Sequence, residues 1–334
     1  MTIEAGGLPY EFRGDSKDLF VVSRRVNAPG GELLLFDRAS GQHRAVAVQP
    51  PADLGHFQLY SAARIRGDRL VASAGWTEKQ RTRNGFVFLT PDGTVTKSIG
   101  YGMTIRSIVV SPTLGLIAAS IMSHIPNEST DIDPPPSFSV GVFDLDGKFL
   151  EQGDVSGINR YATGTEARGA LRGRKPYVVG DAVTMTFPEK SSKCPLSVVV
   201  RNPQTGYVAM AAREKSSAPP LRDVAETTLI LPPHIKDVDP GTLRMTGLAP
   251  VTTGHKTEFI AAWVEGGPDG SIIKSKGHAF VAHYGSKGEA PIDVVPLPPG
   301  TFVGELTATP DGRVYAILFT DVREQGWTIH EVRF

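Results

Sequence analysis

The 334-residue sequence has one cysteine, no net charge and no long apolar run, and each absence excludes a class of protein. One cysteine cannot form an internal disulfide or a thiolate metal cluster. Because 35 basic side chains balance 35 acidic ones, the chain lacks the positive surface of a nucleic-acid-binding protein. No segment approaches the ~20 consecutive apolar residues of a transmembrane helix.

Targeting signals and catalytic motifs are missing as well. The first ten residues contain no basic segment followed by an apolar core. The compartment therefore stays open between the cytoplasm and, after removal of a signal, the periplasm or extracellular space. The sequence contains no Gly-x-Ser-x-Gly, no His-Glu-x-x-His, no phosphate-binding Gly-Lys-Ser/Thr loop and no dinucleotide fingerprint. We predict no cofactor.

Glycine and proline are abundant: the chain has 36 glycines and 26 prolines, and they occur along its whole length without a linker-like block. Many of them belong to tight-turn sequences such as Pro91-Asp92-Gly93 and Pro310-Asp311-Gly312. Turn residues at regular spacing predict many short strands. Two Arg-Gly-Asp tripeptides, at 13–15 and 66–68, resemble the sequence that integrins recognise, and we interpret both as tight turns.

Short apolar strands, each entered from a turn, recur six times. They are residues 19–23, 69–74, 116–121, 182–187, 258–263 and 313–319. An inner-strand candidate precedes each of them, at 10–12, 57–60, 105–110, 177–179, 243–246 and 302–307, and another strand follows each. In the first five units a further hairpin turn leads to a fourth strand, as at 43–48 and 94–99. Each unit is therefore predicted to be a four-stranded antiparallel meander, and six such units predict an all-β, six-bladed β-propeller. A β-sandwich or two smaller barrels are the alternatives.

Two sequence elements add a family resemblance. Residues 309–316 contain Pro-Asp-Gly-x-x-x-Ala, one residue shorter than the Pro-Asp-Gly-x-x-x-x-Ala element, and residues 143–147 match Phe-Asp-x-x-Gly. On these elements nearly the whole chain resembles the six-bladed β-propellers of the NHL-repeat and TolB-like group, whereas the Trp-Asp and Gly-His pairs of WD repeats are absent. We expect a single domain with blades near 10–48, 57–99, 105–153, 172–212, 243–297 and 302–334. The sixth unit supplies only three strands, so residues 2–5 are expected to add the missing outer strand and close the ring.

The longest predicted loops fall on one face of such a propeller. That face, here called the loop-rich face, carries the connections from second to third strands and from one blade to the next. The opposite face is called the tight-turn face, and we expect extra turn length there only around residues 250–256. The long segments are 77–84, 124–137, 154–175, 189–195, 213–241 and 266–277. Loops of this length are often functional, so the loop-rich face is the predicted binding surface.

Basic and aromatic side chains dominate the candidate binding residues. On the rim we predict Trp76, Lys79, Arg81, His124, Arg160, Tyr161, Arg168 and Arg172, and at the channel mouth Arg106, Arg244 and Glu305. Trp76 and Tyr161 would be aromatic anchors, and the arginines suit an anionic ligand or an acidic partner. Solvated loop charge is the alternative for any single residue.

The carboxylates near the channel mouth leave a metal site open as an alternative. Calcium or zinc could be held by some of Glu11, His124, Glu189, Glu265 and Asp321. Some propellers that this chain resembles are calcium- or zinc-dependent lactonases, but the Glu-Gly-Pro start of that pattern is replaced here around Glu11, so no lactonase site is carried over.

We therefore predict a monomeric, non-enzymatic propeller that binds a protein, peptide or glycan through the loop-rich face and channel mouth. The alternative is a metal-dependent, lactonase-like hydrolase or a lyase acting at the channel mouth. A sensor domain of a larger chain is a third possibility.

Overall fold

The chain forms strands and turns throughout the part that the structure describes. This computed structural model describes residues 2–3, 8–24, 31–101, 103–112, 114–123, 137–154, 183–186, 196–201, 207–213, 222–228, 243–253, 256–265, 278–286, 290–298, 300–319 and 327–334. No helix occurs in these ranges, so none of them holds a helix that is long and apolar enough to cross a membrane.

The described strands form six antiparallel four-stranded sheets, numbered here in chain order. Sheet 1 contains β2 (Leu8–Gly14), β3 (Asp18–Arg24), β4 (Glu32–Asp37) and β5 (His43–Ala47), and sheet 2 contains β6 (Gly55–Arg64), β7 (Leu70–Glu78), β8 (Arg81–Leu89) and β9 (Val95–Tyr101). Sheet 3 contains β10 (Thr104–Ser111), β11 (Leu116–Ser123), β12 (Ser137–Asp144) and β13 (Phe149–Asp154), and sheet 4 contains β14 (Val183–Thr186), β15 (Leu196–Arg201), β16 (Tyr207–Arg213) and β17 (Arg222–Thr228). Sheet 5 contains β18 (Leu243–Thr253), β19 (Lys256–Glu265), β20 (Ala279–Tyr284) and β21 (Pro291–Pro296), and sheet 6 contains β22 (Phe302–Ala308), β23 (Val314–Phe319), β24 (Trp327–Val332) and β1 (Thr2–Ile3).

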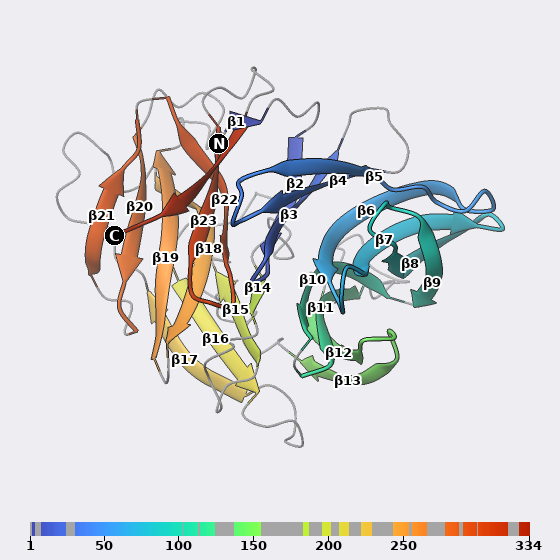
Figure 1. Ribbon diagram of the computed structural model, residues 1–334. Helices are drawn as coiled ribbons and strands as arrows, with labels where there is room; N and C mark the ends of the chain where they lie inside the picture. The colour runs from blue at the N-terminus through green and yellow to red at the C-terminus, as the bar shows by residue number, and fades with distance from the viewer. Residues whose placement is uncertain are drawn as a thin grey trace, which may run out of the picture.

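The first strands of the sheets face one another. Each of β2, β6, β10, β14 and β18 contacts the first strand of the next sheet, and β22 contacts β2. Figure 1 shows β2 and β14 near the middle of the molecule, whereas β9, β13, β17 and β21 lie toward its outside. Antiparallel meanders that meet through their first strands have the arrangement of a β-propeller, and this is the fold of the chain.

The two ends of the chain share sheet 6. β1 pairs antiparallel with β24, with Thr2 opposite Thr328 and Ile3 opposite Trp327. The order of this sheet is β1-β24-β23-β22, so its outermost strand comes from the N-terminus. β1 lies beside the C-terminal strand in Figure 1.

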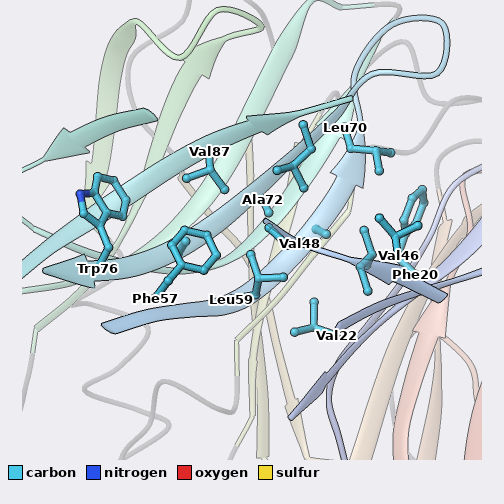
Figure 2. Close-up of a cluster of buried hydrophobic side chains, with 14 of the residues drawn as sticks. Phe20, Val22, Val46, Val48, Phe57, Leu59, Leu70, Ala72, Trp76 and Val87 are labelled. Carbon is cyan, nitrogen blue, oxygen red and sulfur yellow. The ribbon is translucent and has the colours of Figure 1, made fainter. Parts of the chain in front are cut away.

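Sheet 1 is apolar on both faces, because it packs between sheets 2 and 6. In β3, Phe20 and Val22 join a cluster with sheet 2, whereas Leu19 and Val21 join a cluster with sheet 6. Figure 2 shows the first cluster, in which Val46 of β5 and Leu59 of β6 also take part. This packing explains why the strands are continuous apolar runs without the polar–apolar alternation of a sheet with one solvated face.

The glycines of the Asp-Gly turns allow both the turn conformation and close packing against the neighbouring sheet. Gly93 and Gly147 have φ values of 93° and 84°, which favour glycine. A Cβ at Gly93 would lie 2.5 Å from the carbonyl oxygen of Ala47 in the preceding sheet, and one at Gly147 would lie 2.8 Å from the Cδ1 of Ile99. Each turn therefore packs closely against the outer strand of the sheet before it.

Two turn regions expected from the sequence differ from the structure. The predicted loop at 77–84 is a strand extension: β7 runs to Glu78, β8 starts at Arg81, and Lys79 and Gln80 form a two-residue turn with φ values of 47° and 65°. The extra turn length expected around 250–256 is likewise mostly strand, since β18 continues to Thr253. The ends of these hairpins extend beyond the apolar core and carry polar side chains. Their hydrophobicity pattern therefore did not predict strands.

Sheet 4 differs in its strand order. The segment at 182–187, expected to be a second strand, contains the first strand β14, and β17 lies in a stretch expected to be a loop. The expected inner strand at 177–179 lies outside the described residues. First and second strands of a propeller sheet are both buried and equally apolar, so composition alone cannot distinguish them.

Candidate functional site

The first strands share a backbone irregularity at the same level. Five of them insert one extra residue relative to the second strand: between Pro9 and Glu11, Leu59 and Ser61, Ile105 and Ile108, Met245 and Gly247, and Val303 and Glu305. The described register of β14 against β15 is regular. Such a β-bulge bends the strand and re-aims the side chains beside it. We call this level of the molecule the bulge layer.

Polar side chains gather in the bulge layer. Six half-buried polar or aromatic residues lie at or next to the bulges: Glu11, Gln58, Tyr60, Arg106, Thr246 and Glu305. Each of these six residues interacts with at least one other group of the protein. The bulges of β2, β10, β18 and β22 lie in the half of the strand nearer the loop-rich face. In β6 the bulge between Leu59 and Ser61 lies near the middle of the strand, and a second register shift lies in the loop-rich half, between Gly55 and Gln58. The bulge layer thus combines an irregular backbone with half-buried polar side chains.

Tyr60 and Arg106 make the best-defined contact in this belt. The guanidinium carbon of Arg106 lies over the Tyr60 ring, 4.5 Å from its centroid. The Tyr60 hydroxyl donates a hydrogen bond of 3.4 Å to Oδ1 of Asn84. A Cβ at Gly75 would collide with that hydroxyl, so the tyrosine lies against β7 where β7 has no side chain. We call Tyr60, Gly75, Asn84 and Arg106 the Tyr60–Arg106 site.

Buried serines satisfy the backbone groups at the β10 bulge. The Ser73 hydroxyl donates to the carbonyl oxygen of Arg106. The hydroxyl oxygen of Ser61 accepts from the Ile108 N–H at 3.2 Å, and that of Ser120 accepts from the Ser107 N–H at 3.0 Å. A buried backbone group without a partner costs about 1–3 kcal/mol, so these serines compensate for the irregular ladder. They also fix the backbone from which the Arg106 side chain extends.

A charged pair lies on the first strand of sheet 1. Arg13 forms an ion pair with Glu11, and their side chains are only 9% and 12% exposed. Nη1 of Arg13 also donates to the carbonyl oxygen of Phe12 at 3.3 Å. Residues two apart on a strand lie on the same side, which brings the two charges together. Glu11 is therefore held by an arginine of its own strand.

Charges at the tight-turn face tie sheets 1 and 2 together. Arg64, whose side chain is 14% exposed, contacts the carboxylates of Asp15 at 3.2 Å, Asp68 at 2.9 Å, and Asp18. Burial raises the pKa of Asp15 despite the hydrogen bond from the Lys17 N–H and the charge of Arg64. Both Arg-Gly-Asp turns thus place their aspartate on Arg64, which agrees with their interpretation as structural turns.

A second arginine ties sheet 1 to sheet 6. Arg38 donates to the Tyr315 hydroxyl at 3.0 Å, to the carbonyl oxygen of Asp15 at 2.8 Å and to Oδ2 of Asp311 at 2.7 Å. Burial alone would raise the pKa of Asp311, but hydrogen bonds from Arg38 and Thr309 outweigh it and lower that pKa. The tight-turn face is therefore held by charge pairs between sheets.

The predicted rim residues that the structure describes fall into two groups. Trp76 is 3% exposed and packs in the cluster between sheets 1 and 2, which differs from the exposed anchor that we predicted. Figure 2 shows its indole beside Phe57. Lys79 and Arg81 are exposed on the β7–β8 hairpin. No local sequence pattern marks the hairpin after Trp76 as long enough to leave this side chain in the core.

The channel-mouth predictions are placed as follows. Arg106 and Glu305 lie in the bulge layer, on β10 and β22. Arg244 lies on β18 opposite Val264. Glu265 accepts a hydrogen bond from the His278 N–H at 3.1 Å. The predicted residues outside the described part of the chain are His124, Arg160, Tyr161, Arg168, Arg172, Glu189 and Asp321.

A metal site finds no support among the residues that the structure describes: no three His, Cys, Asp or Glu side chains in those ranges group as ligands. Tyr60, Asn84 and the three serines were not among the residues predicted from the sequence. A usable signal was present, because Ser73 and Ser120 each interrupt an otherwise apolar strand, where a hydroxyl needs a polar partner.

Comparison with known proteins gives structural likeness only. No family model matches the sequence, and no curated protein is significantly similar to it. Among solved structures, the chain is similar to a member of the DUF4221 family from Bacteroides vulgatus, with 8% identity and a TM-score of 0.48 over 98% of this chain and 94% of that one. It is also similar to the soluble aldose sugar dehydrogenase of Escherichia coli, with 11% identity and a TM-score of 0.47 over 98% and 96% of the two chains.

A third similar structure is the β-propeller domain of the Trilobed protease from Pyrococcus furiosus. It is 10% identical, with a TM-score of 0.40 over 94% of this chain and 80% of that one. Likeness at these levels transfers no activity, substrate or site residue to this chain.

Proposed function

We propose that the chain is one six-bladed β-propeller whose ring is closed by β1. Three observations support this: six four-stranded sheets, contact between β22 and β2, and pairing of β1 with β24. A closed ring hides strand edges that an open one exposes. Deletion of residues 1–5 should lower the melting temperature by several degrees, because the outer strand of sheet 6 is lost. An unchanged melting temperature would contradict closure by β1.

We propose further that this propeller is a monomeric binding module without enzymatic activity, and that its ligand site is the loop-rich end of the channel at the bulge layer. The observation that carries the proposal is the recurrence of a bulge at one level in five first strands, each beside a half-buried polar side chain. Bulges are enriched next to functional sites, where they aim side chains. Pockets with a few convergent polar groups are the usual small-ligand sites.

A screen of defined peptides, sugars and organic acids by thermal shift and calorimetry tests this proposal. A binder should lose affinity when Tyr60 or Arg106 is replaced by alanine. The matched control is Arg38→Ala, which removes an arginine of similar environment from the tight-turn face. If a compound binds both bulge-layer variants with unchanged affinity but no longer binds Arg38→Ala, its site lies on the tight-turn face.

A further inference from the structure

We infer that the Tyr60–Arg106 site recognises a carboxylate on the ligand; this inference rests on the proposed binding function. The Arg106 guanidinium carbon lies 4.5 Å from the centroid of the Tyr60 ring. A guanidinium over an aromatic ring keeps its N–H donors in its own plane, directed around its edge. Two parallel donors of such a fork match the two oxygens of one carboxylate.

The site is held in place before any ligand binds. Asn84 accepts the hydrogen bond of the Tyr60 hydroxyl, and Gly75 leaves room for the ring. Ser73 and Ser120 bind backbone groups at the bulge from which Arg106 extends. Ordering a flexible arginine on binding would cost affinity, and a fixed one avoids much of that cost. Arg106 and Tyr60 already interact with other groups, so a carboxylate would join that network.

The charge of the bulge layer favours a carboxylate over a phosphate. Glu11 and Glu305 lie on two of the other first strands of the same layer, and Arg13 forms an ion pair with Glu11. Among the charged side chains that the structure describes in this layer, Glu11 and Glu305 balance Arg13 and Arg106. A phosphate monoester carries nearly two negative charges at neutral pH and would be repelled more by these acids than a carboxylate with one. One arginine fork suits one carboxylate.

The test uses the full chain and simple anions at constant ionic strength. Acetate, benzoate and glutarate are titrated while the ¹⁵N resonance of Arg106 Nε is followed; chloride is the background salt and inorganic phosphate the competing anion. A saturable shift of Arg106 with a carboxylate, and a weaker response to phosphate, are expected. Arg106→Lys should weaken carboxylate binding about tenfold, because it keeps the charge and loses the fork.

Two further variants keep the test decisive. Tyr60→Leu should also weaken binding, because it removes the ring under Arg106, and it serves if Arg106→Lys fails to fold. Arg38→Lys on the tight-turn face should bind like the original chain. If no carboxylate shifts Arg106 while a neutral ligand from the screen still depends on Tyr60 or Arg106, the carboxylate inference is wrong and the binding proposal stands. If no compound depends on either residue, both fail.

Discussion

The two ends of the first strands differ in a way that separates stability from function. At the tight-turn end of β6, residues from Ser61 to Arg64 pair in regular register with β7, and Arg64 binds three aspartates. At the other end the register shifts twice, and the side chains of Gln58 and Tyr60 are half-buried. One strand thus ends in charge pairs on one face and in an irregular polar segment on the other.

The irregular end needs compensation that the regular end does not. A bulge interrupts the ladder, and at β10 three serines replace the missing backbone partners. The same irregularity recurs in five sheets, and β-bulges are enriched next to functional sites. The comparison therefore links the charge pairs of the tight-turn end to stability, and it supports the proposal that ligands bind at the bulge layer.

The largest effect is expected at the tight-turn end. Gly93→Ala should lower the free energy of unfolding by about 2–4 kcal/mol, because φ is 93° and the new Cβ would lie 2.5 Å from the carbonyl oxygen of Ala47. Gly41→Ala is the matched control: φ is 68°, but no described atom lies within 4 Å of its Cβ, so a loss of about 1–2 kcal/mol is expected. Urea unfolding measures both, and equal losses would show that the close packing between sheets is unimportant.

The next effect concerns the support of the bulge. Ser120→Ala should destabilise the chain by about 1–3 kcal/mol, because the buried N–H of Ser107 loses its acceptor. Ser98→Ala on the exposed outer strand β9 should change stability by less than about 0.5 kcal/mol. If urea unfolding shows the same small loss of unfolding free energy for Ser120→Ala and Ser98→Ala, the Ser120 hydroxyl does not stabilise the bulge.

A third substitution separates recognition from stability. Gly75→Ala places a methyl group where the Tyr60 hydroxyl lies, so the tyrosine must move away from Asn84. A loss of only about 1 kcal/mol is expected because a side chain can shift more easily than backbone, whereas the carboxylate response of Arg106 should fall severalfold. Gly100→Ala, whose Cβ meets only ordinary contacts at 3.6 Å, should leave both unchanged. An unaltered Arg106 response in Gly75→Ala would mean that the position of Tyr60 does not matter.

The smallest effect is a pH dependence at the tight-turn face. The pKa of Asp311 is lowered from its ordinary value of 3.8 in the folded chain, so its ionised form stabilises the fold above that value. This contribution is lost as the pH falls through the folded pKa. Asp311→Asn should therefore be less stable than the original chain at pH 7, and the difference should shrink below about pH 4. A difference that grows on acidification would reverse the sign assigned to this carboxylate.

The sequence predicted the repeat because turns and apolar runs are local. The expected strand at 105–110 lies within β10, and the one at 302–307 within β22. In sheet 4 the same reasoning assigned 182–187 to the second strand, since strands buried on both faces are equally apolar. Which strand pairs with which is a long-range property that composition does not carry.

The site was predictable only in part. Arg106 and Glu305 were predicted because they lie near the start of expected inner strands, whereas Tyr60 was not, because a tyrosine suits a strand anywhere. One inserted residue reverses which side of the sheet the following residues face, and nothing local marks the insertion. The length of the β7–β8 hairpin, which leaves Trp76 buried, is likewise set by pairing between strands.

Ligand binding at the bulge layer can be located residue by residue. Amide hydrogen exchange of the full chain is measured with and without a binder from the screen. Slower exchange is expected at residues 58–60 and 104–107, with no change at the turn of residues 15–17. Protection confined to that turn, or to the outer strands β5 and β9, would contradict binding at the bulge layer.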